Sequence, residues 1–192
     1  SGPLRALTAW GAFVTGLPGI TVQLLLIPPA AVALRRFAVR DRGRKNALLS
    51  ALNLISEDTA ACVVIKGGVI VRTEYGRGIG PMMKLYESGI LKDAFVVDKI
   101  VGKAAAMIMT LGGVKSCYGI TVSRSAEKWL KESGIPLEYE NLIDSIRNRT
   151  GDGICPMEQT VAEIENADDA LCALKDKIKE LNSAKRRIQN DL

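Results

Sequence analysis

The sequence contains no histidine, and this absence restricts its chemistry more than any other feature of its composition. Neutral imidazole is the usual side-chain base near neutral pH and a common zinc ligand, so histidine triads and nearly every ordinary zinc site are excluded. Aromatic residues make up only 5% of the chain, and its four cysteines lie too far apart for a framework of disulfides. We therefore expect reduced thiols in a cytoplasmic domain, and no cofactor.

The net charge of +5 comes from one end of the chain. Residues 1–45 contain seven basic residues and one acidic residue, Asp41, whereas the remainder contains 19 basic and 20 acidic residues. A domain that binds nucleic acid typically spreads Lys and Arg over a folded face with aromatic side chains among them. With so few aromatic residues and a local basic cluster, no nucleic-acid partner is expected.

An apolar segment precedes the basic cluster. No charged side chain occurs in residues 6–34, and about 20 helical residues are enough to cross a bilayer. Pro18, Pro28 and Pro29 favour a kink, and the Arg and Lys residues that follow fit a cytoplasmic flank. Residues 17–29 resemble the closing helix of the substrate-binding subunit of an energy-coupling-factor vitamin transporter.

These observations predict three parts: an apolar, membrane-spanning segment over residues 1–35, a basic linker over 36–45, and a folded domain over 46–192. The domain would then lie in the cytoplasm, tethered to the inner face of the cell membrane or associated with a membrane transporter. An apolar helix packed on the following domain and a remnant of a longer membrane protein are the alternatives.

After the linker, the sequence alternates between helix and strand patterns. Helices are expected at 46–57, 79–88, 98–111, 142–147 and 155–164, and from Asn166 onward, with Asp98 and Asn166 as N-caps. A further helix ends at Glu132, with Ser123 or Ser125 as its N-cap. Strands are expected at 62–65 and 69–73, which form a hairpin around Lys66-Gly-Gly, and at 94–97, 114–122 and 137–139. This order predicts an α/β fold, a three-layer α/β/α arrangement with a mixed sheet. Three cysteines in apolar contexts, Cys62, Cys117 and Cys172, are expected in the core.

Two segments carry a family resemblance: Asp98-Lys-Ile-Val-Gly-Lys-Ala-Ala-Ala, and Arg147-Asn-Arg-Thr-Gly-Asp-Gly-Ile-Cys-Pro-Met-Glu. With the order of hairpin, helix and strand, they resemble an uncharacterised bacterial domain family with a cytidine-deaminase-like fold. The resemblance implies that Gly102-Lys103-Ala104 stands where deaminases have their His/Cys-x-Glu helix. Likewise, Cys155-Pro-Met-Glu would stand where they have Pro-Cys-x-x-Cys.

The sequence departs from the deaminase pattern at the residues that hold zinc. Zinc deaminases use one His or Cys, two Cys in a Cys-x-x-Cys motif, and a Glu for proton transfer. Here Cys155 is followed by Met157 and Glu158 without a second Cys, and the expected Glu of the first motif is absent. The fold can therefore be deaminase-like without the metal or the reaction, so no metal site is predicted.

A pocket between Lys103 and Cys155 is the candidate site. Pro156 is a favourable first helical residue, which makes Cys155 the N-cap of a helix and puts Glu158 at its third position. The free N–H groups of that helix end would attract an anion and lower the pKa of the Cys155 thiol. The residues predicted to bind a ligand are Lys103, Arg149, Thr150, Gly151, Asp152 and Gly153, with Arg147 adding positive charge.

Three functions remain open from the sequence. The first is a cytoplasmic module that binds or senses a small anionic metabolite or a nucleotide. The second is a zinc-independent enzyme in which Cys155 is the nucleophile and Glu158 or Asp152 handles protons. The third is a protein-interaction module, and a weak homodimer through the last helix, with its heptad-like Leu171, Leu174, Ile178 and Leu181, is a further option.

Overall fold

A computed structural model of the chain describes residues 42–190, apart from 58 and 149. The chain divides into two compact units, residues 1–43 and 44–192, and the description below concerns the second. The predicted apolar segment, 1–35, and most of the predicted linker lie outside the described residues. Within the described residues, no helix combines the length and apolar character needed to span a membrane.

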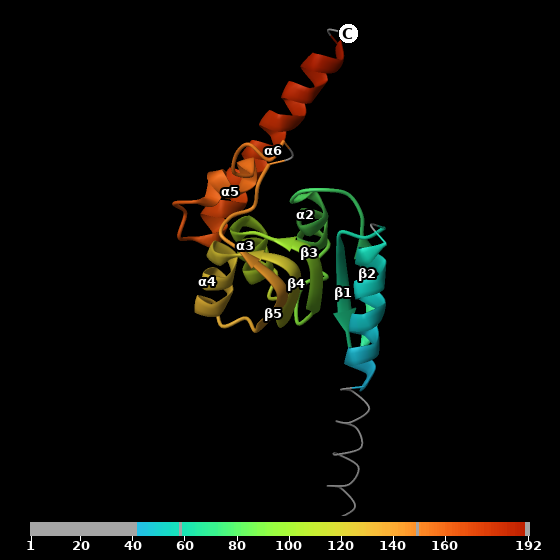
Figure 1. Ribbon diagram of the computed structural model, residues 1–192. Coiled ribbons are helices and arrows are strands. Elements are labelled where there is room, and N and C mark those ends of the chain that lie inside the picture. The colour runs from blue at the N-terminus through green and yellow to red at the C-terminus, as the bar shows by residue number, and fades with distance from the viewer. Residues whose placement is uncertain (1–41, 58, 149, 191–192) are drawn as a thin grey trace, which may run out of the picture. The chain divides into compact units, whose positions relative to one another are not determined.

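The second unit is built on a five-stranded mixed sheet (Figure 1). Its strands are β1 (Cys62–Lys66), β2 (Val69–Glu74), β3 (Phe95–Val101), β4 (Ser116–Ser123) and β5 (Leu137–Ile143), in the spatial order β2-β1-β3-β4-β5. Strand β1 is antiparallel to both of its neighbours, whereas β3, β4 and β5 run parallel. The α/β class and the mixed sheet agree with the prediction.

The hairpin of β1 and β2 closes through two glycines. Gly67 and Gly68 have φ values of 61° and 84°. A two-residue hairpin turn with positive φ at both central positions matches the twist of the flanking strands, and glycine takes this conformation without steric penalty. The Lys66-Gly-Gly turn thus sets the register in which Lys66 lies opposite Val69. A shift in register between Val64 and Ile65 then puts Cys62 opposite Glu74.

One face of the sheet is covered by α2 (Gly80–Glu87), α3 (Lys103–Leu111), α4 (Arg124–Glu132), α5 (Pro156–Val161) and α6 (Ala167–Asn190). Their apolar side chains form the larger core cluster with Val64, Val96 and Cys117 of the sheet. Helix α6 contributes Ala170 and Leu174 to this core, and its C-terminal turns extend beyond the other helices (Figure 1).

The opposite face is packed by the helix 42–56. Ala47, Ala51 and Ile55 recur every four residues along this helix and are buried. They form a second core cluster with Val63, Ile65, Phe95 and Val97 of β1 and β3. The arrangement is therefore three-layered, with helices on both sides of the sheet.

Several predicted boundaries are wrong. Asp98 does not begin a helix, because β3 continues to Val101 through pairing with β4, and Gly102 is the N-cap of α3. Residues 142–147 are not helical, since β5 pairs with β4 as far as Ile143. Helix α5 ends at Val161, before Ile164. Cys172 is exposed on α6, so its assignment to the core is also wrong.

Candidate functional site

Two helices begin side by side at the carboxyl ends of the parallel strands. Helix α3 follows β3 after Gly102, and α4 follows β4 directly, with Ser123 as its N-cap. The Ser123 hydroxyl accepts a hydrogen bond from the Ala126 N–H at 3.2 Å. A helix N-terminus carries partial positive charge, so this edge of the sheet favours a negative group.

The negative group at this position is the carboxylate of Glu158, which comes from α5. Glu158 is only 7% exposed, and its Oε1 accepts a hydrogen bond from the Ala104 N–H at 3.1 Å. Its Oε2 accepts hydrogen bonds from the hydroxyls of Ser123, at 3.4 Å, and Ser125, at 3.3 Å. Glu158 therefore joins the start of α3, the start of α4 and α5.

Gly102 leaves the space that this carboxylate fills. A Cβ atom on residue 102 would lie 2.7 Å from Glu158 Cδ and 3.1 Å from Ile146 Cγ1. The backbone of Gly102 is extended, with φ −96° and ψ 173°, a conformation open to any residue. Glycine at residue 102 thus allows Glu158 to approach the start of α3 this closely.

Lys103, a predicted ligand-binding residue, contacts the other end of α5. Its Nζ donates a hydrogen bond to the backbone carbonyl of Ala162 at 2.6 Å. The carbonyl groups at a helix C-terminus lack intrahelical donors, and a lysine ammonium satisfies one of them favourably. Consecutive residues of α3 thus bind both ends of α5, Lys103 at its C-terminus and Ala104 at Glu158.

The predicted glycine-containing loop forms a small hairpin closed by its own side chains. Arg147 and Ile154 form an isolated bridge. Asp152 Oδ1 accepts hydrogen bonds from Asn148 Nδ2 at 2.7 Å and Thr150 Oγ1 at 2.6 Å, and these bonds hold the pKa of Asp152 below its ordinary value. Gly151 takes a positive φ of 77°, whereas Arg149 lies outside the described residues.

Cys155 is the N-cap residue of α5, and Pro156 is its first residue, as predicted. The thiol is half-buried and packs against the larger core cluster. Within the described part of the chain, neither Asp152 nor Glu158 hydrogen-bonds the Cys155 sulfur, since both carboxylates bind the groups given above. Its role as a nucleophile stays a prediction.

Asp98 is a buried acid that the sequence reasoning placed wrongly. It is 8% exposed in β3, opposite Cys62 of β1 and Gly119 of β4, and its Oδ1 accepts a hydrogen bond from the Ile100 N–H at 3.2 Å. Burial raises the pKa of Asp98 to about 7, and the same burial raises the pKa of the Cys62 and Cys117 thiols. The three apolar residues before it and the two after Lys99 form a strand-like segment around Asp98, and this pattern was the available signal.

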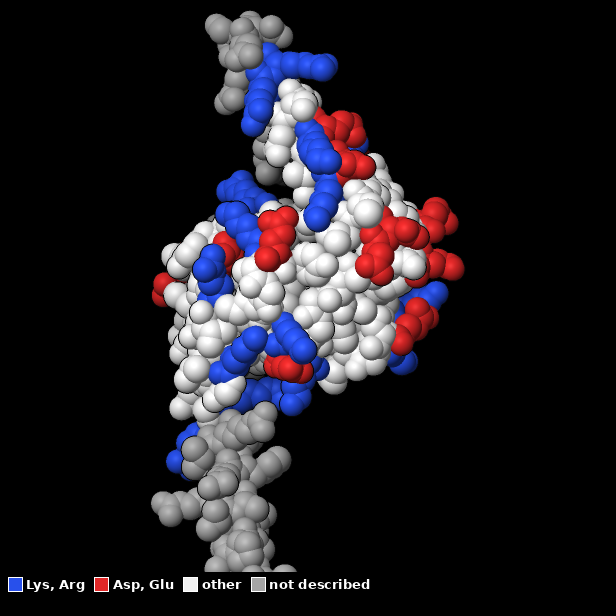
Figure 2. All heavy atoms as spheres, turned by 180° about the vertical axis from the view of Figure 1, so that it is seen from behind, with Lys and Arg blue, Asp and Glu red and all other residues white. Residues whose placement is uncertain are grey.

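The described residues contain no group of three His, Cys, Asp or Glu side chains arranged to hold a metal ion. Charged side chains of both signs are intermixed on the face shown in Figure 2, where Lys and Arg lie beside Asp and Glu without forming a continuous basic surface. We define the Glu158 cluster as Gly102, Ala104, Ser123, Ser125 and Glu158. Its hydrogen-bond donors form a site for a carboxylate.

Comparison with known proteins places the domain in a family. The family model described as TM1506, a domain of unknown function (DUF1893), matches residues 50–178. The crystal structure of a DUF1893 family protein (TM1506) from Thermotoga maritima is similar, with 25% sequence identity and a TM-score of 0.64. The match covers 69% of this chain and 90% of that protein, whereas no curated protein matches. The family model matches more than half of the length of this chain, so the chain belongs to the TM1506 (DUF1893) family.

Proposed function

We propose that this domain binds a small anionic ligand, a carboxylate or phosphate of a metabolite or nucleotide, at the Glu158 cluster. The observation that carries the proposal is the position of the Glu158 carboxylate, bound by the Ala104 N–H and the hydroxyls of Ser123 and Ser125. These are the donors that an external anion would use. Glu158 then holds the site in the absence of ligand, and an entering anion replaces it.

In this proposal, release of Glu158 is accompanied by movement of α5, which has only six residues. A helix of this length has little stability of its own, so its position depends on its contacts with α3. When Glu158 leaves Ala104, the Lys103 bond to Ala162 is the remaining hydrogen bond between the start of α3 and α5. The loop 147–154 precedes α5, and in this proposal Arg149 and Thr150 contact the bound anion as α5 moves.

Two sequence features support a role for this domain as a membrane-associated sensor. The segment that runs from Arg147 to Glu158 underlies the proposed relation to deaminase-like folds, and it contains both Cys155 and the carboxylate of the site. The apolar and basic pattern of residues 1–45 supports a cytoplasmic domain attached to a membrane. Together they describe a membrane-associated sensor for a small anion.

The test is a pair of ligand titrations on the full chain and on Glu158→Ala, followed by thermal unfolding. In Glu158→Ala the donors of Ala104, Ser123 and Ser125 have no carboxylate, so formate or acetate should raise the Tm of this variant more than that of the native chain. A ligand at about 100 times its Kd stabilises by about 2.7 kcal/mol, which is several degrees for a domain of this size.

The native chain should respond to a metabolite or nucleotide that contains a carboxylate or phosphate, and should bind it more weakly than Glu158→Ala does. The matched control is Glu163→Ala, which removes an exposed carboxylate just beyond α5. If acetate rescues Glu158→Ala but no anion stabilises the native chain, Glu158 is only a structural cap and the proposed function is wrong.

A further inference from the structure

The sheet face packed by the helix 42–56 is covered over only part of its width. Strands lie about 4.8 Å apart and a helix is about 10 Å across, so five strands leave room for two helices on one face. Among the described residues, the helix 42–56 is the one helix whose side chains enter the core cluster of this face. It packs on β1 and β3, and this leaves a groove along β4 and β5.

The groove has apolar side chains on its floor, carboxylates along its far side, and Lys99 in the lining of its hollow. Its floor contains Tyr118 and Ile120 of β4, both only partly buried. Its far side contains Glu138 and Glu140 of β5; Glu138 pairs with Arg44 at 3.6 Å, and Glu140 accepts a hydrogen bond from the Tyr118 hydroxyl at 3.3 Å.

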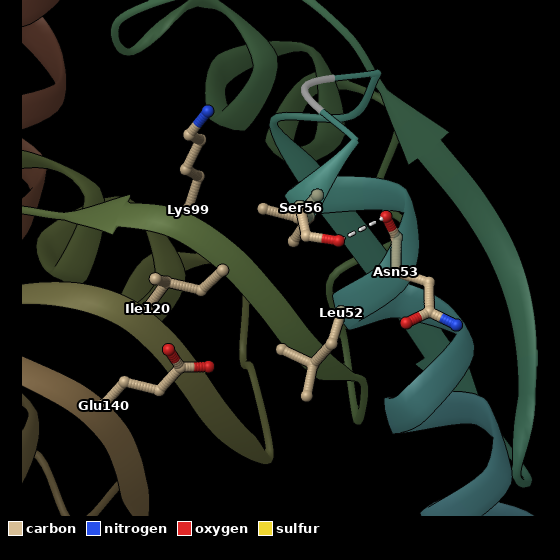
Figure 3. A pocket seen from close by; sticks show the side chains of 7 residues that line it. Leu52, Asn53, Ser56, Lys99, Ile120 and Glu140 are labelled. Atoms are coloured by element: carbon tan, nitrogen blue, oxygen red, sulfur yellow. Dashed lines mark hydrogen bonds between the residues drawn. The ribbon is translucent and has the colours of Figure 1, made fainter.

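The groove deepens into a hollow of about 380 Å³ beside the helix 42–56. Figure 3 shows this hollow, with Leu52 of the helix directed toward the sheet and Ile120 and Glu140 on the opposite wall. Its volume exceeds that of a single leucine side chain, so an apolar side chain from outside has room to enter.

The outer surface of the helix 42–56 carries side chains that could occupy this groove. Leu49 is 61% exposed although it is a large apolar residue. Helical periodicity places Lys45 and Leu49 on one line, two residues out of phase with the buried line of Ala47, Ala51 and Ile55 and therefore nearly opposite to it. The helix thus presents a leucine with a basic residue one turn before it. The groove presents a hollow with the apolar side chains of Leu52 and Ile120 in its walls, and Glu140 and Lys99 also line it.

We infer that a second copy of this chain occupies the groove, and that the two copies form a two-fold dimer through their helices 42–56. In such a dimer each surface contacts its counterpart on the other copy, so one chain must carry both the projecting and the receiving feature, as this one does. Leu49 of each copy enters the hollow between Leu52 and Ile120 of the other, and Lys45 lies near Glu140. The two helices then form a shared layer between two sheets.

The first experiment is cross-linking between two differently tagged full-length chains in detergent solution, each with Cys155 and Cys172 replaced by Ser. One chain carries Leu49→Cys and the other Ile120→Cys. Mild oxidation should join them in a disulfide. The matched control pairs Leu49→Cys with Val71→Cys, an exposed apolar position on the edge strand β2. Equal cross-linking of both pairs, or none in either, would overturn the dimer.

The second experiment measures the dimer by sedimentation equilibrium. Leu49→Asp should weaken association at least about tenfold, because the apolar contacts with Leu52 and Ile120 are lost and a second carboxylate would enter the hollow that Glu140 lines. Glu140→Lys and Lys45→Glu should each weaken it about two- to five-fold, and the double variant should restore it. Unchanged thermal unfolding of each variant at low concentration would show that the fold is intact. A chain that is monomeric throughout, or a dimer insensitive to Leu49→Asp, would contradict the inference.

Discussion

The carboxylate of Glu158 lies against Gly102, so closely that a side chain on residue 102 would displace it. The two residues are far apart in sequence and belong to the two segments that carry the resemblance to deaminase-like proteins. Their contact explains why residue 102 is glycine and residue 158 is glutamate: Glu158 reaches the N-terminus of α3 only because residue 102 has no side chain. It also makes the pair accessible to mutational analysis.

Gly102→Ala should destabilise the domain by about 1–3 kcal/mol, because the new methyl group overlaps the Glu158 carboxylate and approaches Ile146. Urea denaturation of Gly102→Ala, Glu158→Ala and the double variant gives the coupling between the two sites. The added methyl group should cost less when residue 158 is alanine. Additive effects would mean that Ile146, or the backbone, is the source of the strain.

Glu158→Gln should destabilise by about 1 kcal/mol, since the amide keeps the shape of the side chain but loses the favourable charge at the N-terminus of α3. Glu158→Ala should cost more, because it also leaves the buried Ala104 N–H without its acceptor. Chemical denaturation measures both, with Glu163→Gln as an exposed control. A Gln variant as unstable as the Ala variant would assign the effect to charge rather than to the hydrogen bond.

Asp98 predicts an unusual pH dependence of stability. Its pKa is about 7 in the folded domain and near the ordinary 3.8 in the unfolded chain, because burial disfavours the charged form. Between these values the folded state holds a proton that the unfolded state has lost. The contribution of Asp98 to the free energy of unfolding therefore falls as pH rises from about 4 to about 7, by on the order of a few kcal/mol.

Asp98→Asn keeps an oxygen acceptor for the Ile100 N–H but has no charge to bury. The free energy of unfolding of this variant, minus that of the native chain, should be larger at pH 8 than at pH 4.5. Urea denaturation at several pH values measures this difference. Asp144→Asn changes an exposed acid that pairs with Arg124, and should not reproduce this trend. A pH-independent difference between Asp98→Asn and the native chain would argue against the raised pKa.

The four thiols should differ in their rate of alkylation. Cys172 is exposed and Cys155 half-buried, whereas Cys62 and Cys117 are buried and burial raises their pKa. Mass spectrometry after brief treatment with iodoacetamide should find Cys172 modified first, and Cys62 and Cys117 only after unfolding. If Cys155 reacts faster than Cys172, the nucleophile hypothesis gains support over simple exposure.

The sequence predicted the elements that local patterns determine. The hairpin at Lys66-Gly-Gly and the start of α5 at Pro156 each depend on neighbouring residues, and each is present. Of the two serines predicted as alternative N-caps of α4, Ser123 is the one that caps it. Asp98 was misplaced because an acid before an apolar periodic segment has the appearance of an N-cap. Its true position depends on pairing with Cys62 and Gly119, which no local pattern reveals.

The candidate site was predicted only in outline. The two motifs were expected to face each other, and the structure brings Gly102 and Glu158 together. The direction of the Glu158 side chain was not foreseen. It was expected at the third position of its helix, as a group that handles protons beside Cys155, yet it binds the Ala104 N–H at the start of α3, 54 residues earlier. Lys103, expected to face a ligand, binds the end of α5. Both outcomes depend on how α5 packs, which is a property of the folded core.

The attachment of α5 at both ends has a consequence for the order in which the domain assembles. Six residues are too few to nucleate a helix alone, so α5 should become helical only after α3 and β4 have formed the surface that receives Glu158. Amide hydrogens in α5 should accordingly exchange with solvent whenever this attachment opens, long before those of the central strands. Their exchange rate would report the spontaneous opening of α5 in the native protein, without any added probe.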